Sequence, residues 1–244
     1  MPSVHGAFIE RPRLVTFPAY GDAMREAFHD QLDSIFHDLA EICGQVELSV
    51  HNATGALLEG NAEVAEAVIA ADDKIDRARE RVEDTAFNLL SLQQPVAGDL
   101  RVVVSALRMV SELERMGDLS VHVAKIARLR VPEIAVPEEA RPTVSRMGEV
   151  AEDMVRRVAA VITDKDVEAA IELGRDDEEM DQLRRSSFTQ LLSDDWGHGV
   201  ESAVDIALLG RYYERIADHA VSVANRVVFV VTGQFPTARE VSTG

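Results

Sequence analysis

One helical motif occurs twice in this sequence, 100 residues apart. "LERMGDLSVHVAKIA" runs from Leu113 to Ala127, and "YERIADHAVSVANRV" runs from Tyr213 to Val227. The positions that are identical in the two copies are Glu114, Arg115, Asp118, Val121, Val123 and Ala124, repeated as Glu214, Arg215, Asp218, Val221, Val223 and Ala224. Because a long repeat indicates two copies of one structural unit, the sequence predicts two halves of similar fold.

Hydrophobic periodicity predicts that both halves are helical. Long segments carry apolar residues at helical spacing and are separated by short breaks that contain glycine or proline. There are six such segments: residues 22–58, 62–92, 99–128, 139–163, 167–193 and 200–231. No segment shows the alternation typical of a strand. We therefore expect an all-α fold of two tandem three-helix bundles, six long helices in all, related by pseudo-twofold symmetry.

Prolines mark the expected boundaries. Pro132 and Pro137 interrupt "LRVPEIAVPEE" more strongly than any other break, because proline ends a helix and two lie five residues apart. The expected parts are an irregular extension, a first bundle, a linker, a second bundle and a tail: residues 1–21, 22–130, 131–138, 139–233 and 234–244.

Composition excludes several classes of protein. The 43 acidic and 25 basic side chains give a net charge of −18, which argues against a nucleic-acid partner. Cys43 is the only cysteine, so neither a disulfide framework nor a thiolate metal site is available. No apolar run approaches the roughly 20 residues that span a bilayer, and no secretory signal is evident. We expect a cytoplasmic protein. Phosphate-binding glycine loops and nucleophile constellations are also missing from the sequence, which argues against an enzyme.

The same periodicity places the repeated acids outside the apolar stripe. Leu113 and Tyr213 belong to the stripes of their segments and are expected to point inward. Glu114 lies roughly 100° to 140° around the helix from that stripe, and so does its repeat Glu214. Each is followed four residues later by an aspartate, Asp118 or Asp218. Both halves are therefore expected to expose a carboxylate pair.

A second acidic pair precedes each motif. Asp72 and Asp76 lie in "ADDKIDRARE", and Asp177 and Asp181 lie in "RDDEEMDQLR". If the helices are neighbours, four carboxylates meet in each half, and such oxygen-only sites suit magnesium, calcium, manganese or ferric iron. The charge of the metal would relieve the repulsion among the acids. The alternative is a solvated helix face, where like charges four residues apart cost only a few tenths of a kcal/mol.

These features together resemble the PhoU family of bacterial phosphate-signalling regulators. The resemblance rests on the doubled Glu-Arg with its aspartate, the preceding acidic pairs and "QQPVAGDLR" (Gln93 to Arg101), and it covers residues 24–231. It implies a homodimer with surface metal clusters of iron, zinc, magnesium or manganese. The ligands that the resemblance implies are Asp72, Asp76, Glu114, Asp118, Asp177, Asp181, Glu214 and Asp218.

The resemblance also implies a function. Proteins similar to this one restrain phosphate uptake and the phosphate-starvation response by contacting a sensor histidine kinase and the ATPase subunit of the phosphate-specific transporter. The membrane would be reached only through these partners. The acidic charge and the long amphipathic helices agree with such an adaptor. The alternatives are a metal-binding or metal-storing carboxylate bundle, including a metal-dependent enzyme, and a purely structural helical scaffold.

Overall fold

The computed structural model describes residues 20–175 and 177–236, and all regular secondary structure in these ranges is helical. The helices are α1 (Tyr20–Glu59), α2 (Ala62–Gln93), α3 (Ala97–Arg130), α4 (Arg141–Asp164), α5 (Val167–Arg175), α6 (Asp177–Leu191) and α7 (Gly199–Thr232). The predicted all-α fold is confirmed. The expected segment 167–193 comprises α5 and α6, on either side of residue 176. Most of the expected extension and tail lies outside the described residues.

Local chemistry explains where the helices end. Gly60 follows α1 with φ of +68°, a conformation that favours glycine. Asn61 then caps α2, because its side chain accepts a hydrogen bond of 3.1 Å from the backbone N–H of Val64. Gly233 ends α7 with φ of +80°, and its N–H donates to the carbonyl of Phe229. These breaks fold the long helices back on one another.

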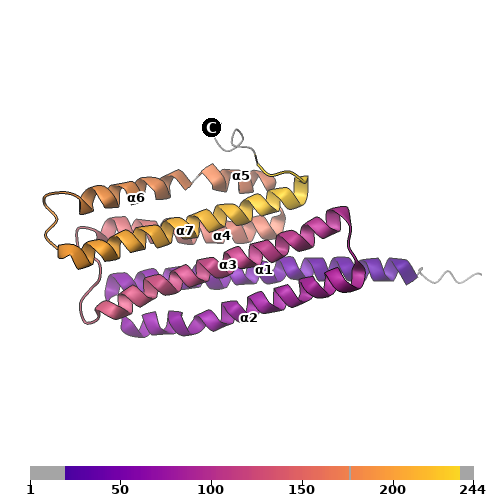
Figure 1. The fold of residues 1–244 in the computed structure, drawn as a ribbon, viewed down its shortest axis with the longest axis horizontal. Coiled ribbons are helices and arrows are strands. Elements are labelled where there is room, and N and C mark those ends of the chain that lie inside the picture. The colour runs from indigo at the N-terminus through magenta and orange to yellow at the C-terminus, as the bar shows by residue number, and fades with distance from the viewer. Residues whose placement is uncertain (1–19, 176, 237–244) are drawn as a thin grey trace, which may run out of the picture.

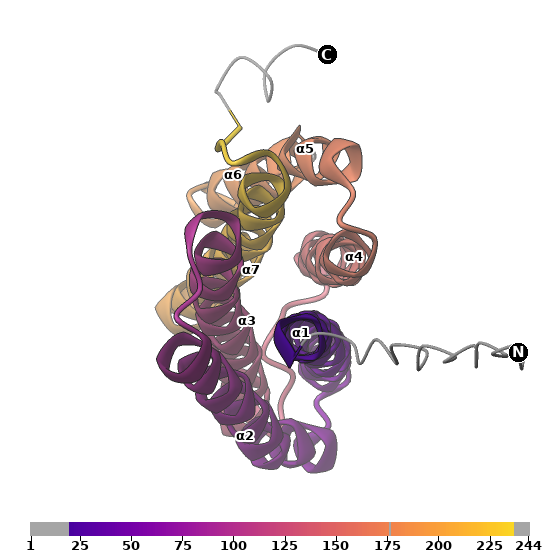
Figure 2. The same cartoon turned by 90° about the vertical axis from the view of Figure 1, so that its right-hand side faces the viewer.

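The helices form a layered arrangement (Figure 2). α2, α3, α7 and α6 follow one another along one side, and α1 and α4 pack against the inner surface of this row. α3 and α7 run antiparallel at the centre, so the α2–α3 turn and the α6–α7 connection lie at opposite ends (Figure 1). The described candidate site residues all lie on the four helices of this row.

A single hydrophobic core joins the two halves. Leu113 and Tyr213 are both buried, as predicted, and the buried side chains of both halves form one continuous cluster. The hydroxyl groups of Tyr213 and Thr54 lie 2.8 Å apart and link α7 to α1. Gly148 allows α4 to approach the same threonine, since a Cβ there would lie 2.5 Å from the Thr54 methyl carbon. The division into two bundles at residues 131–138 stays a prediction, because the packing does not separate them.

Candidate functional site

A close approach of α2 and α3 creates the first carboxylate cluster. A Cβ added at Gly117 on α3 would lie only 3.6 Å from Asp72 Oδ1 on α2. Ile75 Cδ1 on α2 would lie 3.0 Å from the same Cβ, so α2 and α3 run close together where Asp72 and Asp76 lie near Glu114 and Asp118. The structure brings these four predicted residues within electrostatic reach of one another, and we call them the first cluster.

Burial and mutual repulsion both disfavour the ionised form of the acids in the first cluster. Burial raises the pKa of Asp72, and the nearby charges of Asp118 and Asp76 raise it further. Burial likewise raises the pKa of Glu114, with Asp118 adding to the effect and Arg115 opposing it. The Glu114 side chain is only 23% exposed, because α2 packs beside it. It does not lie on the open outer surface that helical periodicity alone predicts.

The second cluster consists of Asp181, Glu214 and Asp218. Burial raises the pKa of Asp218, and the charge of Glu214 raises it further. Glu214 is 12% exposed and is held by two arginines. Arg184 Nη1 donates to its Oε1 at 2.9 Å, and Arg211 Nη1 donates to its Oε2. Asp177 begins α6, but its side chain lies outside the described residues, so its membership of the cluster stays a prediction.

Each cluster contains an arginine that was not among the site residues predicted from the sequence. Arg79 and Arg184 both follow an aspartate by three residues, Asp76 and Asp181 respectively. Arg79 opposes the raised pKa of Glu114, and Arg184 pairs with the equivalent glutamate of the second half. The Nε atoms of both arginines are buried and have no hydrogen-bond partner. The repeated Asp-x-x-Arg spacing was the signal in the sequence that could have found them.

The donor chemistry of the two clusters differs in its fit to a metal ion. With the side chains as they lie in the described residues, no group of three or more His, Cys, Asp or Glu could hold a metal. The first cluster offers four carboxylates, two of them with raised pKa values, and this set suits a hard cation. In the second cluster both oxygens of Glu214 are already occupied by arginines. The first cluster therefore fits a cation better.

His122 and Trp196 make local contacts. His122 Nδ1 lies 2.6 Å from the backbone carbonyl of Asp118, and its ring lies 5.3 Å from that of Tyr212. Trp196 packs partly against the core, and its Nε1 donates to the carbonyl of Gly199 at 2.9 Å. Neither residue extends a cluster.

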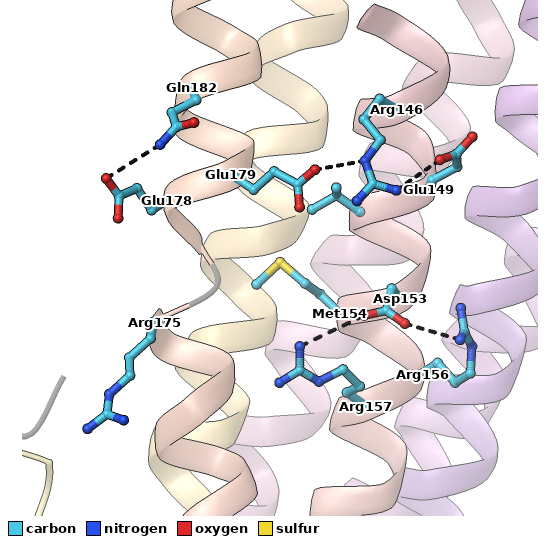
Figure 3. Close-up of a pocket in the computed structure, with 11 residues that line it drawn as sticks. Arg146, Glu149, Asp153, Met154, Arg156, Arg157, Arg175, Glu178, Glu179 and Gln182 are labelled. Atoms are coloured by element: carbon cyan, nitrogen blue, oxygen red, sulfur yellow. Dashed lines mark hydrogen bonds and ion pairs between the residues drawn. The ribbon is translucent and has the colours of Figure 1, made fainter. Parts of the chain in front are cut away.

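A groove of about 640 Å³ runs between α4 and α5–α6 (Figure 3). Its lining includes four arginines, Arg146, Arg156, Arg157 and Arg175, and four acids, Glu149, Asp153, Glu178 and Glu179. Arg146 Nε donates to Glu179 Oε1 at 2.7 Å and so bridges α4 to α6. Two of the arginines also pair with acids on their own helix, Arg146 with Glu149 and Arg156 with Asp153, each three residues away. Since acids of equal number surround them, the groove offers no excess of positive charge.

The described helices include none with both the length and the apolar character needed to cross a membrane.

The comparisons with known proteins agree with this architecture. Residues 39–127 and 144–227 each match the PhoU domain. The chain is 47% identical over 213 residues to a phosphate-specific transport system accessory protein, PhoU homolog 2, of Mycobacterium tuberculosis, a match that covers 87% of this chain and 100% of the relative. It is 42% identical to PhoU homolog 1 of the same species, with 90% of this chain and 100% of the relative covered.

Solved structures show the same fold. The crystal structure of PhoU from Pseudomonas aeruginosa matches with a TM-score of 0.80 and 26% identity, over 85% of this chain and 100% of that one. The phosphate transport system regulatory protein PhoU from Streptococcus pneumoniae matches with a TM-score of 0.77 and 26% identity, over 86% and 99%. These relatives are named as accessory and regulatory proteins of phosphate transport. With its two matched domains and its similarity to these relatives over nearly its whole described length, the chain belongs to the PhoU family.

Proposed function

We propose that this chain is an accessory protein of a phosphate-specific transport system and a negative regulator of phosphate uptake and of the phosphate-starvation response. It acts in the cytoplasm as an adaptor between the ATPase subunit of the transporter and a sensor histidine kinase. The observation that carries the proposal is 47% identity to a phosphate transport accessory protein along that relative's entire length. The long helices, which leave broad polar and apolar surfaces, suit contact with other proteins.

Deletion of the gene tests the regulatory role. Without the adaptor, the phosphate-starvation genes should stay on in phosphate-rich medium, and the wild-type gene supplied on a plasmid should restore repression. Transcripts of the transporter operon are the measurement, and any second homologue has to be deleted as well. Normal repression in the complete deletion strain would argue against the proposal. Adaptor action further requires that the purified protein bind both the ATPase subunit and the cytoplasmic part of the kinase.

We also propose that the carboxylate clusters bind a divalent or ferric ion. In the first half Asp72, Asp76, Glu114 and Asp118 would hold it, and the cation would offset their mutual repulsion. Burial, and then the neighbouring acids, raise the pKa values of Asp72 and Glu114, so a cation bound beside them would stabilise their ionised forms, and this supports the assignment. A second ion at Asp177, Asp181, Glu214 and Asp218 would have to displace Arg184 and Arg211 from Glu214.

Replacement of Glu114 by Gln together with Asp118 by Asn tests the first site. Two anionic ligands disappear while side-chain size is kept, so affinity for iron, manganese, magnesium or zinc should fall by at least about tenfold. Calorimetric titration of chelator-treated protein measures the affinity, and Glu149→Gln with Asp153→Asn, a similarly spaced pair on α4, is the control. If the wild type and the double variant bind these metal ions with equal affinity, Glu114 and Asp118 are not metal ligands.

A further inference from the structure

A region that carries arginines but no acids lies where the start of α3 packs beside the end of α7 (Figure 1). Residues 100–111 of α3 and residues 219–236, which complete α7 and follow it, contain no aspartate or glutamate. Their only lysine or arginine residues are Arg101, Arg108 and Arg226. In a chain of net charge −18, these two stretches therefore carry positive charge only.

The three arginines lack carboxylate partners. Among the described residues, no aspartate or glutamate pairs with Arg101, Arg108 or Arg226. Further along α3, by contrast, Arg115 and Arg128 each pair with an acid. The guanidinium groups near the start of α3 are therefore available to an anion that the chain itself does not supply.

Arg101 is packed in place against α7. Its Cζ lies 5.8 Å from the centre of the Phe229 ring, and a Cβ added at Gly233 would lie 2.7 Å from its Nη1. Gly233 therefore leaves the room that this guanidinium occupies. The Nε of Arg101 is buried and has no hydrogen-bond partner. Because its side chain is already ordered, Arg101 loses little conformational entropy when it binds an anion.

Helical spacing places all three arginines along the line where α3 and α7 meet. Arg101 contacts Phe229 of α7. Arg108 follows Arg101 by seven residues, about two helical turns, so both lie on the side of α3 that faces α7. On α7, Arg226 follows His219 by the same interval, and His219 contacts α3. Arg226 therefore lies on the side of α7 that faces α3.

The two helices run antiparallel, so Arg226 lies lengthwise between Arg101 and Arg108. At 1.5 Å per residue, the backbone from Arg101 to Arg108 spans about 10 Å. Asp99 lies about 200° around α3 from Arg101 and so is on its other side. Glu112, the first acid of α3 beyond Arg108, is held by a histidine of α7. We call Arg101, Arg108 and Arg226 the arginine seam.

The opposite end of the α3–α7 pair is built differently. The repeat makes Glu201 equivalent to Arg101, and Glu201 pairs with Arg130 of α3 together with Asp205. There the chain supplies the carboxylates that satisfy an arginine between the two helices. At the arginine seam it supplies none, so the complementary anion is missing from the described residues.

We propose that the arginine seam binds an anion of the phosphate class, either free inorganic phosphate or the phosphate groups of a nucleotide. Guanidinium groups bind phosphate oxygens through paired, charge-assisted hydrogen bonds, and several of them together favour an anion with more than one negative charge. A seam about 10 Å long accommodates one small ligand. It is short for a protein interface, which buries about 800 Å² on each partner.

Calorimetric titrations with inorganic phosphate and, separately, with ATP test the seam. They are done at constant ionic strength and with chelator, so that no metal ion bridges the anion to the carboxylate clusters. Arg101→Gln and Arg226→Gln should each weaken the binding of at least one of the two anions by at least about tenfold, because each removes a charged donor group. Arg101→Lys keeps the charge but loses the paired donors, so it should restore only part of the affinity.

Arg215→Gln is the matched control. Arg215 is an exposed arginine of α7 that also lacks a carboxylate partner, and it lies outside the arginine seam. Its loss changes the net charge of the chain as much as the seam substitutions do and should leave anion binding unchanged. Circular dichroism verifies that all variants fold.

The two titrations identify the source of the phosphate group. Binding of inorganic phosphate that the seam variants lose assigns the free anion, and binding of ATP alone assigns a nucleotide. If neither anion binds the wild type, or if all variants bind equally, the inference is wrong. It is also overturned if neither anion binds and the seam variants lose only a protein partner. Because the deletion test measures gene expression and not anion binding, the proposed function and the arginine seam can fail independently.

Discussion

At the scale of single residues, the buried hydrogen bond between Tyr213 and Thr54 has a donor that the surrounding contacts identify. Thr54 Oγ1 donates its only proton to the carbonyl of Val50 at 2.8 Å. The 2.8 Å contact between Thr54 and Tyr213 therefore uses the phenolic hydrogen, with Tyr213 as donor. Burial raises the pKa of Tyr213, so the phenol remains protonated and able to donate.

Removal of this hydroxyl has a defined cost. Tyr213→Phe keeps the buried ring and loses one hydrogen bond, so the free energy of unfolding should fall by about 0.5–1.5 kcal/mol. Urea unfolding followed by circular dichroism measures it. Tyr212→Phe, on the neighbouring and less buried tyrosine, is the control. No change in Tyr213→Phe would mean that water replaces the phenol as the partner of Thr54.

The raised pKa of Asp72 predicts a pH dependence with a definite sign. Because the folded state holds this proton more tightly than the unfolded chain, stability falls as pH rises from the unfolded pKa through the raised folded value. Asp72→Asn removes that loss. In chelator, the melting temperature of the variant minus that of wild type should grow as pH rises from the ordinary aspartate pKa of 3.8 and level off above the raised pKa of the folded state. Asp73→Asn removes an adjacent exposed carboxylate and serves as the control. A difference that shrinks with pH would contradict the assignment.

Residue-level detail was also where the sequence was least informative. The four acids of the first cluster could be identified from the repeat, since their spacing fixes their side of each helix. The half-burial of Glu114 and the arginine beside it could not, because both depend on how closely α2 approaches α3 at Gly117. A helical wheel gives direction but not the distance to the next helix.

At the scale of helices, the predicted segments match the observed ones to within a few residues where a break has a local cause. Gly60 with Asn61, and Gly233, are such causes. The groove of Figure 3 has no local cause, since it depends on how α4 faces α5 and α6 across the chain. Its ion pair between helices, Arg146 with Glu179, became recognisable only from the packing.

Helix packing makes Gly148 sensitive to the smallest substitution. In Gly148→Ala the new Cβ would lie 2.5 Å from the methyl carbon and 2.8 Å from the hydroxyl oxygen of Thr54. Since that threonine is held by two hydrogen bonds, α4 has to move, and stability should fall by about 1–3 kcal/mol. Gly55→Ala is the matched comparison, because nothing lies within 4 Å of its Cβ. It should stabilise the protein by up to about 1 kcal/mol through helix propensity. Equal effects in denaturant titrations would refute the close approach at Gly148.

At the scale of the whole molecule, the two halves share one core although the sequence repeats. Periodicity identifies the buried side of each helix but does not say which helices meet across the repeat. The pairing of α1 with α4 and of α3 with α7 supplies that information. Arg130, at the end of α3, adds a bidentate contact to Asp205 near the start of α7, at 2.6 and 3.1 Å.

A shared core predicts that the chain unfolds as one cooperative unit. Leu57→Ala on α1 removes a fully buried side chain from the first half and should cost about 2–5 kcal/mol. Trp196, the only tryptophan, lies in the second half and packs partly against the core. If the halves unfold together, Leu57→Ala should shift the unfolding midpoint followed by tryptophan fluorescence by the same amount as the midpoint followed by circular dichroism, which reports on all helices. Exposed Leu48→Ala should shift neither. A fluorescence midpoint that stays at the wild-type value while the dichroism splits into two phases would show that each half folds by itself.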